Sequence, residues 1–183
     1  MVKLVKGCSL AAPLLITSAV MAQQGTWQEY RSGGGFIVRL PGVPTIESQL
    51  VSNPVIGGSV TLNTATVGLK VGGYAAAYAD FPLNYVLPRK EALDGARDKI
   101  IQSLGATLRE EQSLSIAGNP ARDVFADIPK PGGVVRCRLI LTAQNRLIEL
   151  MYAGPEGTEA SESVSYFMNS FVILNESTKA ARQ

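Results

Sequence analysis

The sequence predicts an α+β fold, in which an antiparallel β-sheet of about six to eight strands packs with two amphipathic helices. Most of the chain consists of short runs with strand-like alternation, joined by turns rich in glycine and proline, which is typical of antiparallel hairpins. Two other stretches have apolar residues at helical spacing. Each helical stripe must be buried, and the sheet is the only large apolar surface that can cover it.

The first 22 residues have the layout of a secretory signal peptide. Lys3 and Lys6 precede an uncharged run over residues 8–21, which ends in a small-residue cleavage site after Ala22. The run is shorter than the ~20 residues that a membrane-spanning helix needs. We therefore expect cleavage, and no stable membrane insertion afterwards; retention of the segment as an anchor is the alternative.

After cleavage, we expect a single domain over residues 23–174 and a polar C-terminal tail over residues 175–183. The mature length of 161 residues falls within the size of one domain. The sequence contains no internal repeat and no linker long enough to separate two domains. The predicted location of the protein is periplasmic or secreted.

Charge and residue content exclude several classes of function. Of 17 Lys and Arg, two belong to the signal peptide, so the mature chain has equal numbers of basic and acidic residues and lacks the positive field that nucleic-acid binding requires. The chain contains no histidine, which removes Ser-His-Asp and Cys-His catalysis and imidazole-based zinc sites. Cys137 is alone after cleavage, so no intramolecular disulfide forms. We expect no metal, no cofactor and no enzymatic activity.

The N-terminal half of the domain is predicted to be β-structure. Residues 36–40 (FIVRL) alternate like a strand, which ends where Pro41 and Pro44 flank Gly42. Further strands are expected over Thr45 to Val51, Ser59 to Leu69 and Tyr74 to Phe81.

The run from Ser59 to Leu69 changes its apolar phase part-way along. Val60 and Leu62 have one parity, whereas Ala65 and Val67 have the other. A slip of one residue turns side chains to the opposite face of a sheet. The phase change therefore predicts a β-bulge near residues 63–64.

The first helix is predicted from Pro88 to Leu104, with Gly105 as its C-terminal cap. Its apolar stripe consists of Leu93, Ala96, Ile100 and Leu104. The opposite face is expected to be solvated and to carry ion pairs rather than a calcium site, since carboxylates and cations alternate along it. The charged residues on that face are Lys90, Asp94, Arg97 and Asp98.

The C-terminal half returns to β-structure and ends in a second helix. That helix is predicted from about Glu159 to Phe171, because four apolar residues recur at helical spacing. These are Val164, Phe167, Met168 and Phe171. The preceding strands are expected over Leu108 to Ile116, Ala121 to Ile128, Val134 to Leu141 and Arg146 to Tyr152.

The order of several short motifs resembles that of exported bacterial proteins of unknown function related to the PsbP-like (PsbP/Mog-type) superfamily. The motifs are Phe36-x-Val38-x-Leu40-Pro41-Gly42-x-Pro44, Tyr74-x-x-x-Tyr78-x-Asp80-x-Pro82, Leu93-Asp94-x-x-Arg97-Asp98, Gly118-x-Pro120-x-Arg122-Asp123, Arg146-Leu147-Ile148-Glu149-Leu150 and Tyr166-Phe167-Met168-Asn169-Ser170-Phe171. The resemblance covers nearly all of the mature chain. It implies an α/β/α sandwich, a fold used by extrinsic photosystem subunits and a nuclear-import factor, and it supplies no catalytic residue.

Three consecutive glycines, Gly33 to Gly35, raise the question of a phosphate-binding loop. Such a loop lies between a strand and a helix, so that backbone N–H groups and the helix dipole converge on the anion. Here the glycines precede a strand instead. We interpret them as a flexible lead into that strand and as part of the scaffold.

Arg136 and Arg138 are the most suggestive candidates for a binding site. In a strand they share one face, whereas Cys137 points to the other and is expected to be an inert core residue. The arginines can pair with acidic side chains of neighbouring strands, namely Asp123, Asp127 or Glu149. Alternatively, their planar guanidinium groups form a patch for a carboxylate or phosphate.

Tyr74 and Tyr78 are the remaining site candidates. They either line a pocket near the arginines or belong to the core with their hydroxyl groups reaching water. A concave pocket with unpaired arginines would favour ligand binding, whereas arginines paired with Asp or Glu would disfavour it.

The leading functional hypothesis is a non-enzymatic exported accessory domain that binds a partner, for instance another envelope protein, through a sheet edge, a sheet face or its loops. The rival is a small anionic-ligand-binding or envelope-stress protein that uses the arginine patch. A third hypothesis is an enzyme that uses carboxylates alone, which needs two acids of different pKa in one cleft.

Overall fold

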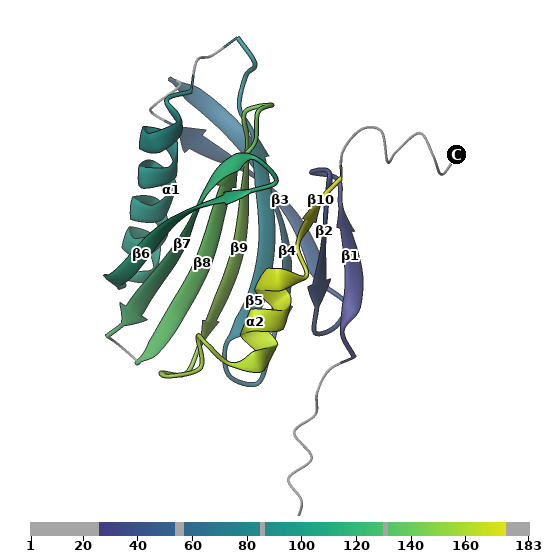
Figure 1. The fold of residues 1–183 in the computed structure, drawn as a ribbon, viewed down its shortest axis with the longest axis vertical. Coiled ribbons are helices and arrows are strands. Elements are labelled where there is room, and N and C mark those ends of the chain that lie inside the picture. Colours follow the sequence, from purple (N-terminus) through teal and green to yellow (C-terminus); the bar gives the residue numbers. More distant parts are fainter. Residues whose placement is uncertain (1–25, 54–56, 85–86, 130–131, 175–183) are drawn as a thin grey trace, which may run out of the picture.

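A computed structural model describes residues 26–53, 57–84, 87–129 and 132–174 (Figure 1). The predicted signal peptide and C-terminal tail lie outside these residues. Two antiparallel sheets and two helices are formed. The elements are β1 (Gln28–Ser32), β2 (Phe36–Leu40), β3 (Thr45–Asn53), β4 (Gly58–Gly68), β5 (Gly73–Asp80), α1 (Arg89–Leu104), β6 (Thr107–Ile116), β7 (Asn119–Ile128), β8 (Gly133–Leu141), β9 (Arg146–Gly154), α2 (Glu162–Asn169) and β10 (Val172–Ile173).

The larger sheet has seven strands in the order β3-β4-β5-β9-β8-β7-β6, and all its neighbouring strands run antiparallel. The smaller sheet has the order β1-β2-β10. The prediction of an α+β fold is confirmed. The seven-stranded sheet falls within the predicted range, and the three strands of the smaller sheet bring the described total to ten.

The seven-stranded sheet is the middle layer of the molecule. On one face α1 packs over β7 and β8, whereas α2 and the smaller sheet lie on the other face (Figure 1). Two core clusters result: Leu93 of α1 belongs to one together with Leu139, and Phe167 of α2 belongs to the other together with Phe36 and Ile148. Because both faces of the sheet are covered, β8 is buried along most of its length and no residue of β9 is fully exposed.

The predicted bulge near residues 63–64 is wrong. Strand β4 pairs with both neighbours without a register shift. Its change of apolar phase arises because the two covering layers lie over different parts of the strand: Val60 joins the core on the α1 side, whereas Ala65 and Val67 join the core on the α2 side. The register shift that does occur lies in β6, at residues 108–110.

Both helices form where the apolar stripes predict them. Helix α1 is bounded by Pro88 and by Gly105, whose φ of 56° is the left-handed conformation that favours glycine. Helix α2 is shorter than predicted: it begins after Ser161, whose hydroxyl accepts a hydrogen bond from the N–H of Val164, and its C-terminal cap is Ser170. Beyond Ser170 the chain pairs with β2 as β10. No helix among the described residues is long and apolar enough to cross a membrane.

Candidate functional site

The side chains of Arg136 and Arg138 lie on the α2 side of the sheet, and a single carboxylate pairs with both. Arg138 binds Asp123 of β7 through two parallel contacts, Nε to Oδ1 at 2.6 Å and Nη2 to Oδ2 at 2.7 Å. Its Nη1 donates to the backbone oxygen of Met168 in the last turn of α2, at 2.9 Å. Cations are favoured at that end of a helix. Arg138 therefore ties two strands to the helix that covers them.

Arg136 is paired less completely. Its Nη2 lies 3.3 Å from Asp123 Oδ2, its Nη1 donates to the backbone oxygen of Glu159 at 3.4 Å, and its guanidinium carbon lies 5.1 Å from the centre of the Phe125 ring. Its Nε is buried and has no hydrogen-bond partner among the described residues. If an anion binds this group, it must do so at Arg136, since the N–H donors of Arg138 are engaged by Asp123 and Met168.

Burial makes this pairing structurally important. The side chains of Arg136, Arg138 and Asp123 are 15%, 13% and 7% exposed. An ion pair shielded in this way is costly to break, because the remaining charge stays buried without compensation. Arginines that pair with Asp or Glu are expected to disfavour ligand binding. The pairing with Asp123 therefore disfavours the anion-binding hypothesis.

Tyr74 is buried in an aromatic cluster. The centres of the Trp27, Tyr152 and Phe167 rings lie 5.7, 5.0 and 5.1 Å from the centre of its ring. Burial, and to a smaller extent the neighbouring Tyr152, raise the pKa of Tyr74 to about 12. Tyr74 lies in the same cross-strand row as Arg136, with Tyr152 between them. It supports the α2 face of the sheet from within the core.

Tyr78 lies elsewhere on the same face, with its ring against Gly33 and Gly34. Arg146 stacks on its ring at 5.1 Å, binds Asp80 through Nε at 2.5 Å and Nη2 at 2.8 Å, and donates through Nη1 to the backbone oxygen of Gly34. The hydrogen bonds that Arg146 donates to the Asp80 carboxylate raise the pKa of its guanidinium group. The glycines form the turn between β1 and β2, and no helix follows them directly, so the geometry of a phosphate loop is absent from this described turn.

Gly34→Ala is expected to lower the free energy of unfolding by about 1–3 kcal/mol, as overpacking does. An added Cβ at Gly34 would lie 2.6 Å from two ring atoms of Tyr78. The Tyr78 ring also packs against the guanidinium group of Arg146. Urea unfolding measures the change. Gly95→Ala is the matched control, because an added Cβ there meets nothing within 4 Å on the exposed side of α1, and it is expected to stabilise by about 0.5–1 kcal/mol. Equal effects of the two substitutions would contradict this account.

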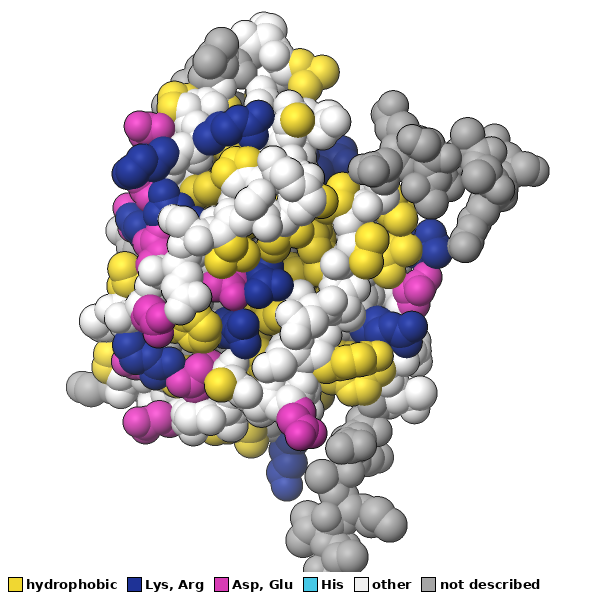
Figure 2. All heavy atoms as spheres, in the orientation of Figure 1, with side chains coloured by type: hydrophobic (Ala, Val, Ile, Leu, Met, Phe, Trp, Pro, Cys, Tyr) yellow, Lys and Arg dark blue, Asp and Glu magenta, His cyan; other side chains and the backbone are white. Residues whose placement is uncertain are grey.

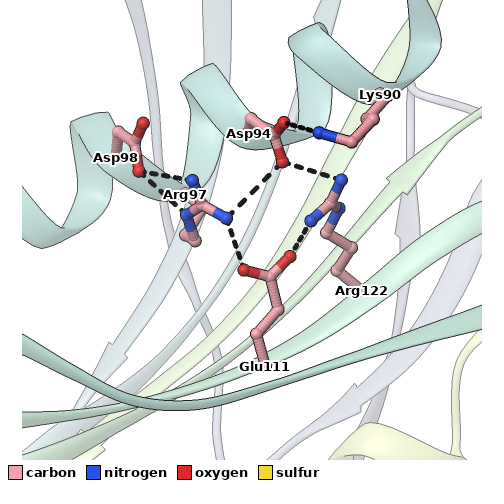
Figure 3. Close-up of polar contacts among 6 residues, drawn as sticks. All are labelled: Lys90, Asp94, Arg97, Asp98, Glu111 and Arg122. Atoms are coloured by element: carbon pink, nitrogen blue, oxygen red, sulfur yellow. Dashed lines mark hydrogen bonds and ion pairs between the residues drawn. The ribbon is translucent and has the colours of Figure 1, made fainter.

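The charged face of α1 is solvated only in part. The side chains of Lys90 and Asp98 are 76% and 68% exposed, as predicted, whereas Asp94 and Arg97 join a network with β6 and β7 (Figure 3). The predicted pairs Lys90–Asp94 (2.8 Å) and Asp94–Arg97 (3.5 Å) are confirmed. In addition, Glu111 of β6 accepts from both Arg97 and Arg122, and Arg122 lies 2.7 Å from Asp94. The hydrogen bond from Lys90, together with the charges of Arg122, Lys90 and Arg97, lowers the pKa of Asp94.

This network has as many cations as carboxylates, since Asp98 also pairs with Arg97. It fastens α1 to the last two strands of the sheet and leaves no excess charge for a ligand. Figure 2 shows the same mixture on the surface of this view, where basic and acidic side chains are interspersed near α1 and β6. Residue spacing does not predict the roles of Glu111 and Arg122, because their contacts depend on where α1 crosses the sheet.

Glu149 is the most unusual carboxyl group of the described chain. As a partner for the arginines it is excluded, because it pairs with Leu139 and Ala77 and therefore faces the α1 side. There it is partly buried, and desolvation raises its pKa to about 7, against a smaller opposing effect of Lys99. Cys137 lies on the same side, is fully buried as predicted, and its pKa is raised by burial.

The two edges of the large sheet differ sharply. Strand β6 carries consecutive charged residues, Arg109, Glu110 and Glu111, and its register is interrupted. Strand β3 pairs with β4 in unbroken register over nine residues and has one charged residue, Glu47. Charges and bulges are the usual devices that stop an edge from pairing with another chain. Strand β6 has several charges and a register shift, whereas β3 has one charge, no bulge and no proline.

Apolar side chains project from this unprotected edge. Ile46 is 56% exposed and Leu50 is 71% exposed, on the same side of β3. Every residue from Thr45 to Leu50 is exposed. An open row of backbone donors and acceptors with alternate apolar side chains is the surface that accepts an added strand. The β3 edge (Thr45–Asn53) is therefore the candidate interface.

Comparison with one solved structure supports the architecture. The solution structure of cyanobacterial PsbP (CyanoP) from Synechocystis sp. PCC 6803 superimposes with a TM-score of 0.56 at 11% sequence identity, covering 86% of this chain and 98% of that one. Protein PA94 of unknown function from Pseudomonas aeruginosa matches with a TM-score of 0.39 at 10% identity, covering 78% and 92%. No family model matches the sequence, and no curated protein is similar to it. The chain thus has a PsbP-like fold.

Proposed function

We propose that the mature chain is a non-enzymatic, exported accessory domain that binds another envelope protein by accepting an extended segment of it at the β3 edge. The observation that carries this proposal is the contrast between the two sheet edges. One edge has the charges and the register shift that prevent strand addition, and the other is regular over nine residues and exposes two large apolar side chains.

The remainder of the described chain supports a binding role rather than a catalytic one. The charged clusters that could have formed a site are held in internal ion pairs: Asp123 pairs with both arginines of β8, and Glu111 pairs with Arg97 and Arg122. Glu149 has a raised pKa, but a carboxylate-only enzyme needs a second acid beside it. Among the described residues, no group of three potential metal ligands is found.

In strand addition, backbone hydrogen bonds supply affinity, and side chains at alternate positions supply specificity. Ile46 and Leu50 are four residues apart and so contact the same face of an added strand. A partner segment with apolar residues at alternate positions would cover both. Export remains a prediction from the N-terminal segment and is consistent with this role.

Affinity capture from the cell envelope tests the proposal when the edge is varied. The protein and its Ile46→Lys/Leu50→Lys variant are used as baits, and retained proteins are compared. We expect at least one envelope protein to be retained by the wild type and lost by the variant. Leu108→Lys on β6 is the control, since Leu108 is exposed on the opposite edge, and should retain that protein. Identical retention by all three baits would refute the proposal.

A further inference from the structure

We infer that the β3 edge also accepts a second copy of this chain, and that the two β3 strands pair antiparallel about a two-fold axis centred on Ser48. The inference rests on the proposed function, in that it names an occupant of the same edge. An axis perpendicular to the sheet relates two antiparallel edge strands and preserves the faces of the sheet, so residues of equal parity lie opposite each other.

The sequence of β3 is self-complementary in this register. Ile46 lies opposite Leu50 of the second copy, and by symmetry Leu50 lies opposite Ile46 of the second copy. The exposed apolar side chains then form two cross-strand pairs on the α2 side of a continuous sheet, one on either side of the two Ser48 residues. Cross-strand pairs of large apolar side chains stabilise a sheet relative to alanine pairs.

Charge is also accommodated in this register. Glu47, the one charged residue of β3, lies opposite the neutral Gln49. The mature chain has no net charge, so no long-range repulsion opposes the approach of two copies. The isologous arrangement that results is the commonest type of homo-oligomeric contact.

Neighbouring registers are less favourable. Centring the axis on Glu47 places this carboxylate opposite itself, and like charges directly opposite each other are destabilising. Centring it on Gln49 places Ile46 and Leu50 opposite the serines of β3. Centring it on Leu50 pairs Leu50 with itself but leaves Ile46 without a residue of β3 opposite it. Only the Ser48-centred register satisfies both the apolar and the charged positions.

Sedimentation analysis of the purified protein with charge-paired variants tests the register. We expect a concentration-dependent dimer for the wild type. Gln49→Glu places a carboxylate opposite Glu47 twice per dimer and should raise the dimer Kd about tenfold, whereas Gln49→Lys should lower it by a similar factor. The double variant Glu47→Lys/Gln49→Glu restores opposite charges and should dimerise more tightly than Gln49→Glu. Gln112→Glu on the β6 edge should leave the Kd unchanged.

A wild-type protein that stays monomeric at its highest soluble concentration would overturn the inference. Equal effects of Gln49→Glu and Gln49→Lys would overturn the register. Affinity capture tests the proposed function independently of the dimer. The Gln49→Glu variant keeps Ile46 and Leu50 and should still retain the envelope partner. Partner capture that depends on β3 without any dimer would uphold the proposed function alone. A dimer with the expected charge dependence, but without β3-dependent capture, would uphold the self-pairing alone.

Discussion

Asp123→Asn is expected to lower the free energy of unfolding by about 3–5 kcal/mol, because it leaves buried guanidinium charge without a counter-charge. Asp123 is the carboxylate on which Arg136 and Arg138 converge, and its side chain is 7% exposed. The asparagine keeps the size of the side chain, so the change reports the charge and its hydrogen bonds. Urea unfolding at neutral pH, followed by circular dichroism, gives the difference.

Asp98→Asn is the matched control for that measurement. Asp98 is also bound to an arginine, at 2.8 Å, but its side chain is 68% exposed, so the expected change is below about 1 kcal/mol. If Asp123→Asn lowers the free energy of unfolding no more than Asp98→Asn does, the pairing of Asp123 with the two arginines does not stabilise the fold. Substantial stabilisation of the wild-type protein by added phosphate would instead revive the anion-binding hypothesis at Arg136.

Glu149→Gln is expected to act in the opposite direction and to stabilise the protein at pH 8 by about 1–3 kcal/mol. The pKa of Glu149 is raised from 4.5 to about 7 in the folded state by desolvation. Between these two pH values the folded state binds more protons than the unfolded state, so the stability of the wild type falls as the pH rises. The neutral glutamine does not incur this loss.

Unfolding measured at several pH values distinguishes this effect from a general change in packing. The variant and the wild type should converge below about pH 4.5, where the carboxyl group is protonated in both states, and diverge up to about pH 7. Glu110→Gln on the exposed surface of β6 should change stability by less than about 0.5 kcal/mol at any pH. A constant difference between Glu149→Gln and the wild type across this range would contradict the assigned pKa.

At Arg136 and Arg138, the alternation of residues along one strand predicts which face each side chain takes, but not its partner. Alternation along β8 placed Arg136 and Arg138 on one face and Cys137 on the other, and the structure agrees. The identity of their acidic partner could not be predicted from the same pattern. Asp123, Asp127 and Glu149 are equal candidates until the register is known. The register sets Glu149 opposite Leu139 on the far face, and Asp127 pairs with Arg109 instead.

The apparent bulge in β4 shows where local pattern misleads. A change of apolar phase is the expected sign of a bulge when only one face of a sheet is covered. Here α1 and the smaller sheet cover opposite faces and different parts of the strand, so the same pattern arises in a regular strand. The position of the covering layers decides between the two interpretations.

The sequence by itself determined the fold class, both helices, most strand positions and the absence of histidine chemistry. These features depend on the spacing of apolar residues, on glycine and proline, and on composition, all of which act locally. Only the tertiary structure decided which strands form the edges, which carboxylate pairs with the arginines and where Glu149 is desolvated. Those properties arise from the order and register in which distant strands pair. The spacing of residues within one strand does not predict which strands will lie beside it.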